Sequence, residues 1–526
     1  MNGIVDSSRN KLSAVHYSGN MWRVMPLLLL LLSLVTGLSS ASSQSFWIDE
    51  ANSALKAVQP TWHGFLNLMA VERGSDLQMP GYMVALWGWS KILSFSEYGL
   101  RSLNILFFLG AQAAFCFSLR ASAKERSFVL LAVMVSPFLW SYLDEARPYI
   151  MQFCGATLMV VVIWNSTFIP RSNALVADLG VFCLGAIILC ASSLLGVIHA
   201  LFFGLLLLAA LALNKRLLDL LRTRSAQVII AATALVLAGM GAYYFWTLTL
   251  GAKASAVGQT SLATLLFAVY ELMGFGGLGP GRLELREIGP RSLIPYTGLL
   301  ALGFLPYLLA GLWLAIERPA VHRSKRIPSL VIGLALAGAF LAIAAVGFLG
   351  DFRVVGRHFM PLAPFLLMIL GLVWARMWNA WFWRLAVVAS LLIFFCSSLN
   401  QRFASRFAKD DYRSAAAVAH DAGLAKAVVW WAADPAAANF YGVFPSVGTP
   451  APSDLQNSSP ATSSVYFANN RSAEYLSGLP KADVAILSKV DIYDPNGTLR
   501  AWMTANGFAV TRTFPAFTIW EKEVKR

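Results

Sequence analysis

The sequence has few charged residues. Asp, Glu, Lys and Arg make up 13% of the 526 residues, and 57% are hydrophobic, whereas a soluble globular chain is about 25% charged and about 45–50% apolar. The apolar residues gather in runs of roughly 18–25, each long enough to cross about 30 Å of hydrocarbon. This pattern excludes a soluble enzyme, a fibrous protein and a disordered chain. It predicts a polytopic α-helical membrane protein that lives in a lipid bilayer.

Cysteine is also scarce. The five cysteines lack the paired spacing of a zinc site, and their odd number argues against a complete disulfide framework; we expect small buried apolar side chains. The net charge of +14 would suggest nucleic-acid binding in a soluble chain. In a membrane chain, cytoplasmic loops enriched in Lys and Arg explain this charge, so we expect no nucleic-acid partner.

The apolar runs predict eleven transmembrane helices. The first follows a basic N-terminus and resembles a signal peptide, but it is nearer to spanning length and no A-x-A cleavage pattern follows it, so we expect an uncleaved span. The predicted spans are 24–41, 101–119, 127–142, 149–168, 174–193, 196–213, 226–250, 295–316, 329–349, 358–375 and 382–399.

Residues 80–96 decide the topology, because a further span there would reverse the side of every later loop. If this segment is not a span, most of the Lys and Arg residues in short loops lie on the cytoplasmic side, as the positive-inside rule requires. The segment is short, carries Lys91 and is rich in Trp, like a helix that lies at the membrane interface. We expect the N-terminus inside, the C-terminus outside, and interfacial helices within a long external loop over 42–100.

The composition changes near residue 401. Runs rich in β-forming residues at 428–431, 465–468, 484–487 and 508–520 alternate with helical stretches such as 412–423, separated by turn-forming residues. This predicts two domains: a transmembrane domain over 1–400 and an extracytoplasmic α/β domain over 401–526.

Charged residues collect at the ends of three external loops, and such residues at membrane depth are candidates for function. The topology puts all three loops on one side of the membrane. The first loop carries Asp49, Glu50, Asp76 and Tyr82; the second carries Asp144, Glu145, Arg147 and Tyr149; the loop before the tenth span carries Asp351, Arg353, Arg357 and His358.

These residue types suit the transfer of a group from a phosphate carrier. A carboxylate can take the proton from an attacking hydroxyl, and arginine holds phosphate through bidentate hydrogen bonds. Arg357 stands where a helix begins, which also favours an anion. Simpler roles remain open: either acidic pair could solvate a loop end, Asp144-Glu145 could pair with Arg147, Arg357 could anchor the interface, and His358 could pack.

Four segments together resemble the bacterial GT-C glycosyltransferases, which are related to protein O-mannosyltransferases and to the lipid A aminoarabinose transferase. The resemblance covers 20–210 well and 350–400 moderately. The segments are Trp47-Ile-Asp49-Glu50-Ala51, Asp76-x-x-x-Pro80-x-Tyr82, Ser96-Glu97-Tyr-x-Leu100-Arg101 and Asp144-Glu145-Ala-Arg147-Pro148-Tyr149. The later Gly356-Arg357-His358-Phe-Met-Pro361 is similar to the family's arginine-proline helix start. The family often has Pro-Pro before the first-loop Tyr, where this chain has Met79-Pro80-Gly81-Tyr82.

The resemblance implies an inverting transfer of a sugar from a polyprenyl phosphate carrier to an acceptor hydroxyl on a glycan, glycolipid or protein. Residues 1–400 would be the catalytic domain, in a bacterial inner membrane with the active site facing the periplasm. Asp49 would be the general base, with Glu50 as its competitor, and Asp144 and Glu145 would position donor or acceptor. Some GT-C proteins hold a divalent metal on such acids, but those that resemble this chain more closely generally do not, so we expect neither metal nor cofactor.

Two rivals stay open. A ligase or polymerase would use a diphosphate-linked glycan, and a transporter would move a lipid-linked glycan without consuming it. Transporters usually contain internal repeats and broken helices that bind at the midplane, and the sequence has no internal repeat. We favour the transferase.

Overall fold

The computed structural model describes residues 5–171, 174–250, 258–317, 323–350, 352–446, 465–468 and 473–522. The chain folds into two compact units. The first contains Met1–Ala41, Leu66–Trp89 and Arg101–Ala404. The second contains Ser42–Phe65, Ser90–Leu100 and Ser405–Arg526, so two segments of the predicted first external loop fold with the C-terminal residues.

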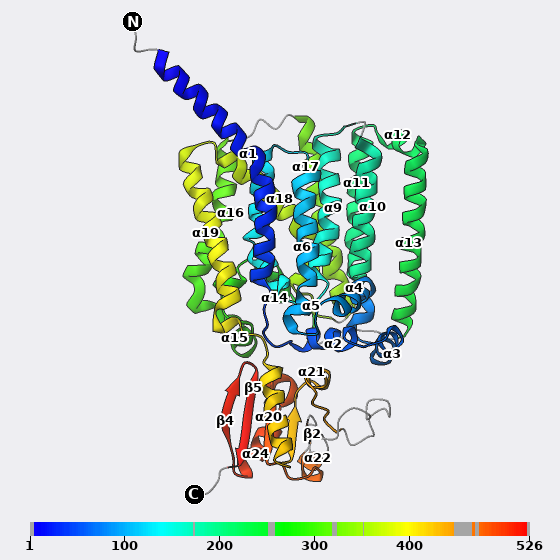
Figure 1. Cartoon of the computed structure of the whole chain (residues 1–526), viewed down its shortest axis with the longest axis vertical. Helices are drawn as coiled ribbons and strands as arrows, with labels where there is room; N and C mark the ends of the chain where they lie inside the picture. The colour runs from blue at the N-terminus through cyan, green and yellow to red at the C-terminus, as the bar shows by residue number, and fades with distance from the viewer. Residues whose placement is uncertain are drawn as a thin grey trace. The chain divides into compact units, whose positions relative to one another are not determined.

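The first unit is a bundle of long apolar helices (Figure 1). The helices of this unit, with those that continue into the second, are α1 (Val5–Ser40), α3 (Trp62–Glu72), α4 (Pro80–Ile92), α5 (Glu97–Arg101), α6 (Leu103–Ala113), α7 (Ala123–Met134), α8 (Pro137–Leu143), α9 (Tyr149–Phe168), α10 (Leu175–Ser192), α11 (Leu194–Leu213), α12 (Leu217–Arg222), α13 (Arg224–Thr249), α14 (Leu262–Leu272), α15 (Arg282–Ile288), α16 (Thr297–Glu317), α17 (Arg323–Leu349), α18 (Ala363–Met377) and α19 (Trp381–Phe403). Short turns of other helix types are η1 (Ser75–Gln78), η2 (Ala114–Ser118), η4 (Gly276–Leu278), η5 (Gly289–Tyr296) and η6 (Gly356–Leu362).

The chain is a multi-pass membrane protein. Within the described residues, ten helices are long and apolar enough to cross a bilayer, and the bent pair α7–α8 makes an eleventh if it counts as one span. The bend of 57° falls at Ser136-Pro137, because proline lacks an N–H and disfavours helical geometry in the residue before it. These spans coincide with the eleven that the sequence predicts.

Helix α4 corresponds to the ambiguous segment 80–96. Its 13 residues rise by about 20 Å, which is too short for the hydrocarbon layer. It is not among the helices that could span. The structure therefore agrees with leaving this segment out of the topology.

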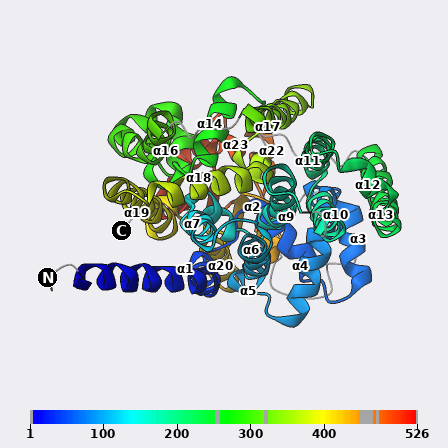
Figure 2. The same cartoon turned by 90° about the horizontal axis from the view of Figure 1, so that it is seen from above.

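Helix α9 lies at the centre of the bundle, in contact with α6, α10, α11 and α18 (Figure 2). Close approach of α9 to α10 depends on two facing glycines. A Cβ on Gly155 would lie 2.8 Å from the carbonyl oxygen of Gly185, and one on Gly185 would lie 2.6 Å from the carbonyl oxygen of Gly155. Such small residues let membrane helices pack backbone against backbone.

Four of the cysteines, Cys116, Cys154, Cys183 and Cys190, are buried as expected. Cys396 is exposed, which corrects the expectation of burial for that residue. It lies on α19, a helix with other exposed apolar side chains such as Leu392 and Phe395. A small apolar side chain is tolerated there because this surface faces lipid.

The second unit contains a five-stranded sheet in the order β2-β1-β3-β5-β4. Strand β1 pairs in parallel with β2 and β3, whereas β5 pairs antiparallel with β3 and β4. Its elements are α2 (Ile48–Ala57), η7 (Ser405–Phe407), α20 (Tyr412–Leu424), β1 (Val429–Ala432), α21 (Pro435–Phe440), β2 (Val465–Phe467), α22 (Ala473–Gly478), β3 (Val484–Ser488), α23 (Val490–Tyr493), α24 (Thr498–Ala505), β4 (Phe508–Phe514) and β5 (Phe517–Lys522).

The predicted strand run over 508–520 is a hairpin. Pro515 cannot donate to the ladder, and Ala516 has a φ of 65°, so the chain turns between β4 and β5. The core against the sheet includes Trp430, Leu487 and Met503, all essentially buried. A C-terminal sheet is therefore present, as the sequence predicts.

Candidate active site

The first unit gathers three arginines around Glu271, and a fourth, Arg286, near Arg353. Glu271, at the end of α14, accepts a hydrogen bond of 2.8 Å from the backbone N–H of Gly356, the first residue of η6. A Cβ at position 356 would lie 2.6 Å from a Glu271 carboxylate oxygen, so only glycine allows this contact. Because of it, the helix start that carries Arg357 is fixed to α14.

The electrostatics of this cluster are dominated by positive charge. Burial raises the pKa of the Glu271 carboxyl, while the Gly356 N–H and then the charge of Arg357 oppose that rise, with further opposition from Arg282 and Arg353. Burial, then the like charges of Arg357 and Arg286, lower the pKa of Arg353. Arg282, Arg286 and Arg357 all act on Arg353, so positive charge is concentrated here, and arginine side chains are suited to binding an anion. We call Arg282, Arg286, Arg353, Arg357 and Glu271 the arginine cluster.

The second predicted loop lies against the arginine cluster. The guanidinium carbon of Arg357 is 5.8 Å from the ring centroid of Tyr149, a cation–π distance. The Tyr149 ring in turn packs edge-on against Tyr142, with centroids 4.9 Å apart. Tyr142 interacts electrostatically with Glu145 and Glu271. Predicted site residues from two distant parts of the chain, Tyr149 and Arg357, are therefore in contact.

Several predicted site residues form buried ion pairs. The Arg147 guanidinium contacts the Asp76 carboxylate at 2.9 Å, and it also approaches the Ser75 hydroxyl at 3.4 Å. Asp144 lies 3.8 Å from Arg101, whose side chain is fully buried. Burying a charge is costly unless it is paired, and within the first unit these pairs fix the second loop to η1 and to Arg101.

The remaining first-unit candidates are more enclosed. The Asn104 side-chain amide donates to the backbone carbonyl of Glu145, which fixes the second loop to α6. Tyr82 is fully buried on α4. The ring nitrogen Nδ1 of His358 accepts from the Val355 N–H at 3.1 Å, so this imidazole helps to cap η6. Substrate contact by Tyr82 or His358 stays a prediction.

Asp49 and Glu50 belong to the second unit, on the first turn of α2, and their environments differ. Glu50 is fully buried and forms an ion pair of 3.0 Å with Lys409. Asp49 is half-buried. The carboxyl of Asp434 has a pKa raised by burial, and the negative charge of Asp49 contributes to that rise, so these two acids lie near each other.

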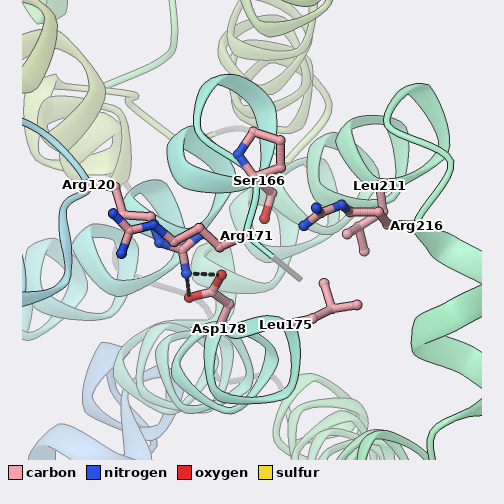
Figure 3. A pocket seen from close by; sticks show the side chains of 8 residues that line it. Arg120, Ser166, Arg171, Leu175, Asp178, Leu211 and Arg216 are labelled. Carbon is pink, nitrogen blue, oxygen red and sulfur yellow. Dashed lines mark hydrogen bonds and ion pairs between the residues drawn. The ribbon is translucent and has the colours of Figure 1, made fainter. Parts of the chain in front are cut away.

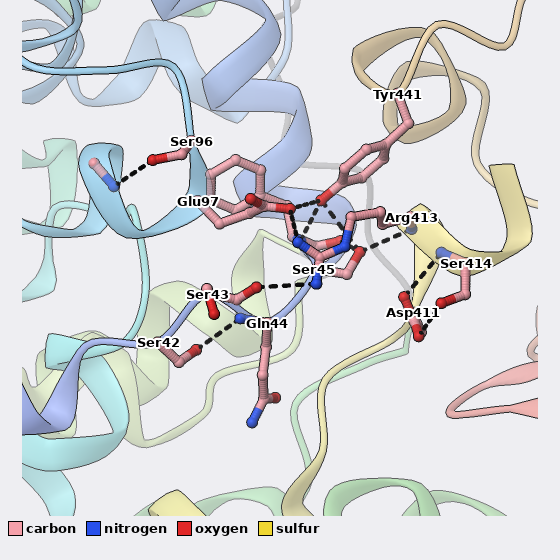
Figure 4. Close-up of polar contacts among 12 residues, drawn as sticks. Ser42, Ser43, Gln44, Ser45, Ser96, Glu97, Asp411, Arg413, Ser414 and Tyr441 are labelled. Carbon is pink, nitrogen blue, oxygen red and sulfur yellow. Dashed lines mark hydrogen bonds and ion pairs between the residues drawn. The ribbon is translucent and has the colours of Figure 1, made fainter. Parts of the chain in front are cut away.

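A polar network fixes the segment before α2 to the C-terminal residues of the same unit (Figure 4). The Tyr441 hydroxyl donates to Glu97 at 3.0 Å and accepts from the Phe46 N–H at 2.8 Å. Burial raises the pKa of the Tyr441 phenol, which keeps it protonated as the donor to Glu97. The Arg413 guanidinium contacts the Glu97 carboxylate at 3.2 Å, and the Arg413 backbone N–H donates to the Ser45 hydroxyl at 3.1 Å.

No protein-family model matches the chain, and no curated protein matches it. Its structure is similar to two crystal structures of ArnT, a lipid A aminoarabinose transferase, from Cupriavidus metallidurans. The apo structure gives a TM-score of 0.54 and 12% identity over 94% of this chain and 97% of that one. The structure bound to undecaprenyl phosphate gives 0.52 and 12% over 95% and 98%. The chain therefore shares the fold of these two structures.

A cryo-EM structure of the arabinofuranosyltransferase AftD from Mycobacteria also matches, with a TM-score of 0.36 and 14% identity over 95% of this chain and 40% of AftD. The two ArnT matches confirm the predicted resemblance at the level of the fold. They leave the roles of individual residues as predictions.

The sequence analysis missed three residues of the arginine cluster: Glu271, Arg282 and Arg286. The available signal was a single acid at the end of an otherwise apolar stretch, 262–272, because an ionisable residue in such a stretch is a functional candidate. Lys409 was missed as well, and no local pattern connects it with Glu50. Asp351, part of the predicted third loop, lies outside the described residues, and so does the Pro- and Ser-rich stretch 450–460.

No group of three or more His, Cys, Asp or Glu side chains that could hold a metal ion occurs in the described part of the chain. The expectation that no metal is needed stays a prediction.

Proposed function

We propose that the chain is a membrane glycosyltransferase that moves a sugar from a polyprenyl-phosphate carrier to an acceptor hydroxyl. The observation that carries this proposal is the arginine cluster, in contact with Tyr149, in a chain with the fold of ArnT. ArnT has been crystallised with undecaprenyl phosphate, and a site rich in arginine suits the same phosphate chemistry here. The donor's polyprenyl tail would lie in the bilayer, and the acceptor would be a glycan, glycolipid or protein.

The transfer would proceed as an inverting displacement. The acceptor O–H gives its proton to the Asp49 carboxylate while its oxygen bonds to the anomeric carbon. The bond between that carbon and the phosphate oxygen breaks, and the electron pair leaves with the phosphate. The arginine cluster would stabilise the charge that develops on this leaving group. Asp144 and Glu145, in the second loop beside the arginine cluster, would position donor or acceptor, and the pairing of Asp144 with Arg101 would hold that loop in place.

The distribution of cations in the loops supports an extracytoplasmic active site in a bacterial inner membrane. The predicted cytoplasmic loops carry Arg120, Lys124, Arg171, Lys215 and Arg216. The positive-inside rule places such loops in the cytoplasm. The loops with the candidate site residues would then face the periplasm.

A radiolabelled-sugar assay tests the proposal. Purified protein in lipid nanodiscs is expected to consume a polyprenyl-phosphate-linked single sugar and to release polyprenyl phosphate when a mixed cell-envelope extract supplies the acceptor. Heat-inactivated protein is the control. The transporter would be established instead if neither a monophosphate-linked nor a diphosphate-linked donor is consumed and the lipid-linked sugar moves across the membrane of a vesicle that contains the protein.

One observation favours a second candidate. Four arginines lie in one cluster, and a diphosphate presents more oxygens to guanidiniums than a single phosphodiester does. This favours a ligase or polymerase that uses a diphosphate-linked glycan. Selective consumption of the diphosphate-linked donor in the same assay would favour this candidate over the monophosphate-dependent transferase.

The raised pKa of Glu271 predicts pH-dependent donor binding. The donor is a phosphodiester, which keeps one negative charge throughout the neutral range. As the pH falls through the Glu271 pKa, the cluster loses its carboxylate charge and becomes more positive, so binding should tighten. Glu271→Gln removes this charge at every pH. We expect about 3- to 10-fold tighter donor binding at neutral pH and loss of the pH dependence, measured by tryptophan fluorescence titration.

The matched control is Glu125→Gln, the same substitution at a capping-box position on α7 where glutamine also caps. It should leave donor affinity and its pH profile unchanged. A Glu271→Gln variant that keeps the parent pH profile would show that another group titrates, and the role of Glu271 in donor binding would be withdrawn.

A further inference from the structure

A second basic site lies at the other end of the helical bundle. Arg120, Arg171 and Arg216 line a shallow pocket together with Asp178, between the ends of α9, α10 and α11 (Figure 3). Helix α9 begins at Tyr149, beside the arginine cluster, and ends at Phe168, near this pocket. Its 20 residues span about 30 Å, so the pocket is separate from the candidate active site by the thickness of a bilayer.

Only one of the three arginines is neutralised. One guanidinium nitrogen of Arg120, Nη2, donates to both carboxylate oxygens of Asp178, at 2.8 and 2.6 Å. Arg171 is exposed and Arg216 half-buried; among the described residues neither guanidinium has an ion-pair partner, although Arg216 lies near enough to Asp178 to interact with its charge. Three guanidiniums and one carboxylate give the pocket two uncompensated positive charges.

The pocket is held in place by hydrogen bonds from two asparagines. Asn165 accepts from the Arg120 N–H at 2.8 Å and donates to the Ser118 carbonyl at 2.8 Å. Asn214 donates to the Ser166 carbonyl at 2.9 Å. These bonds tie the chain beside Arg120 and Arg216 to the end of α9, so the cations are presented on a fixed frame.

The surroundings of the pocket identify the occupant as a lipid. Ile169, Leu213 and Leu218 near these helix ends are 37%, 51% and 64% exposed, and such apolar surface is covered by acyl chains in a bilayer. We propose that the pocket binds the phosphodiester headgroup of an anionic phospholipid, with Arg171 and Arg216 as the phosphate ligands and the Arg120–Asp178 pair as their support. Basic pockets between membrane helices bind anionic headgroups in this way, and the loop cations put the site in the cytoplasmic leaflet.

The test is the double variant Arg171→Gln/Arg216→Gln, which leaves the Arg120–Asp178 pair intact. The matched control is Arg222→Gln/Arg224→Gln, which removes two exposed arginines from the same end of the bundle that do not line the pocket. Phosphatidylglycerol is titrated into each detergent-purified protein, and bound lipid is counted by native mass spectrometry. We expect affinity to fall at least about tenfold in the pocket variant, and by less than twofold in the control.

Three results would overturn the proposal. Equal losses in the two variants would indicate a diffuse electrostatic effect, and no loss in the pocket variant would remove the site. Displacement of the lipid by millimolar inorganic phosphate would assign the pocket to a soluble phosphate compound. Thermal unfolding of both variants, compared with the parent protein, separates loss of the site from loss of the fold.

Discussion

Asp49→Asn is expected to reduce sugar transfer by about 10²- to 10⁴-fold, the usual contribution of a positioned general base. The substitution keeps the size and hydrogen-bonding shape of the side chain but removes its basicity. Donor binding should be unchanged, because the arginine cluster is intact. The measurement is the transfer rate from a polyprenyl phosphosugar at saturating donor, normalised to folded protein.

The structure distinguishes Asp49 from its neighbour Glu50. Glu50 is fully buried and paired with Lys409 at 3.0 Å, whereas Asp49 is half-buried and is the more accessible of the two to an acceptor hydroxyl. Removing one partner of a buried pair typically costs about 3–5 kcal/mol. Glu50→Gln should therefore lower the thermal unfolding temperature, a change that Asp49→Asn should not produce.

The control for both substitutions is Asp411→Asn in the same unit. Asp411 caps α20 by accepting from the Ser414 N–H at 3.0 Å, and asparagine caps equally well, so activity and stability should match the parent protein. If Glu50→Gln is inactive but stable while Asp49→Asn is active, the general base is Glu50. Normal rates in both would show that loop 1 does not carry the base.

Arg357→Lys is expected to weaken donor binding by about 10- to 100-fold, the range for losing a charge-assisted hydrogen bond. Lysine keeps the positive charge but cannot form the planar bidentate contact with phosphate. It would also lose the stacking of the guanidinium on the Tyr149 ring, 5.8 Å away. The measurement is the dissociation constant of a polyprenyl phosphosugar in nanodiscs.

Arg384→Lys is the matched control. Arg384 lies at the start of α19, and its side chain donates to the Trp378 carbonyl at 2.8 Å, away from the arginine cluster. The donor affinity of Arg384→Lys should equal that of the parent protein. Arg357→Lys and Arg384→Lys should both unfold at the same temperature as the parent protein. If the donor affinity of Arg357→Lys is unchanged, Arg357 does not bind the phosphate, and its role is that of an anchor at the membrane interface.

The sequence by itself determined that this is a multi-pass membrane protein, where its spans lie and which loops carry charge. Spans are recoverable from sequence because a bilayer imposes one simple condition, about 20 consecutive apolar residues. This is a local constraint, so a single sequence contains it in full.

Only the tertiary structure decided which charges meet. Glu271 accepts from Gly356, 85 residues later, and Lys409 pairs with Glu50 across 359 residues. The tertiary structure also distinguished Asp49 from Glu50, which are adjacent in sequence and alike in chemistry, because only Glu50 is fully buried. Side-chain direction and long-range pairing depend on how helices pack, and packing is satisfied by many combinations of small and apolar residues. No local pattern therefore specifies these contacts, which is why the complete arginine cluster and the pocket of Arg120, Arg171 and Arg216 emerged only from the folded chain.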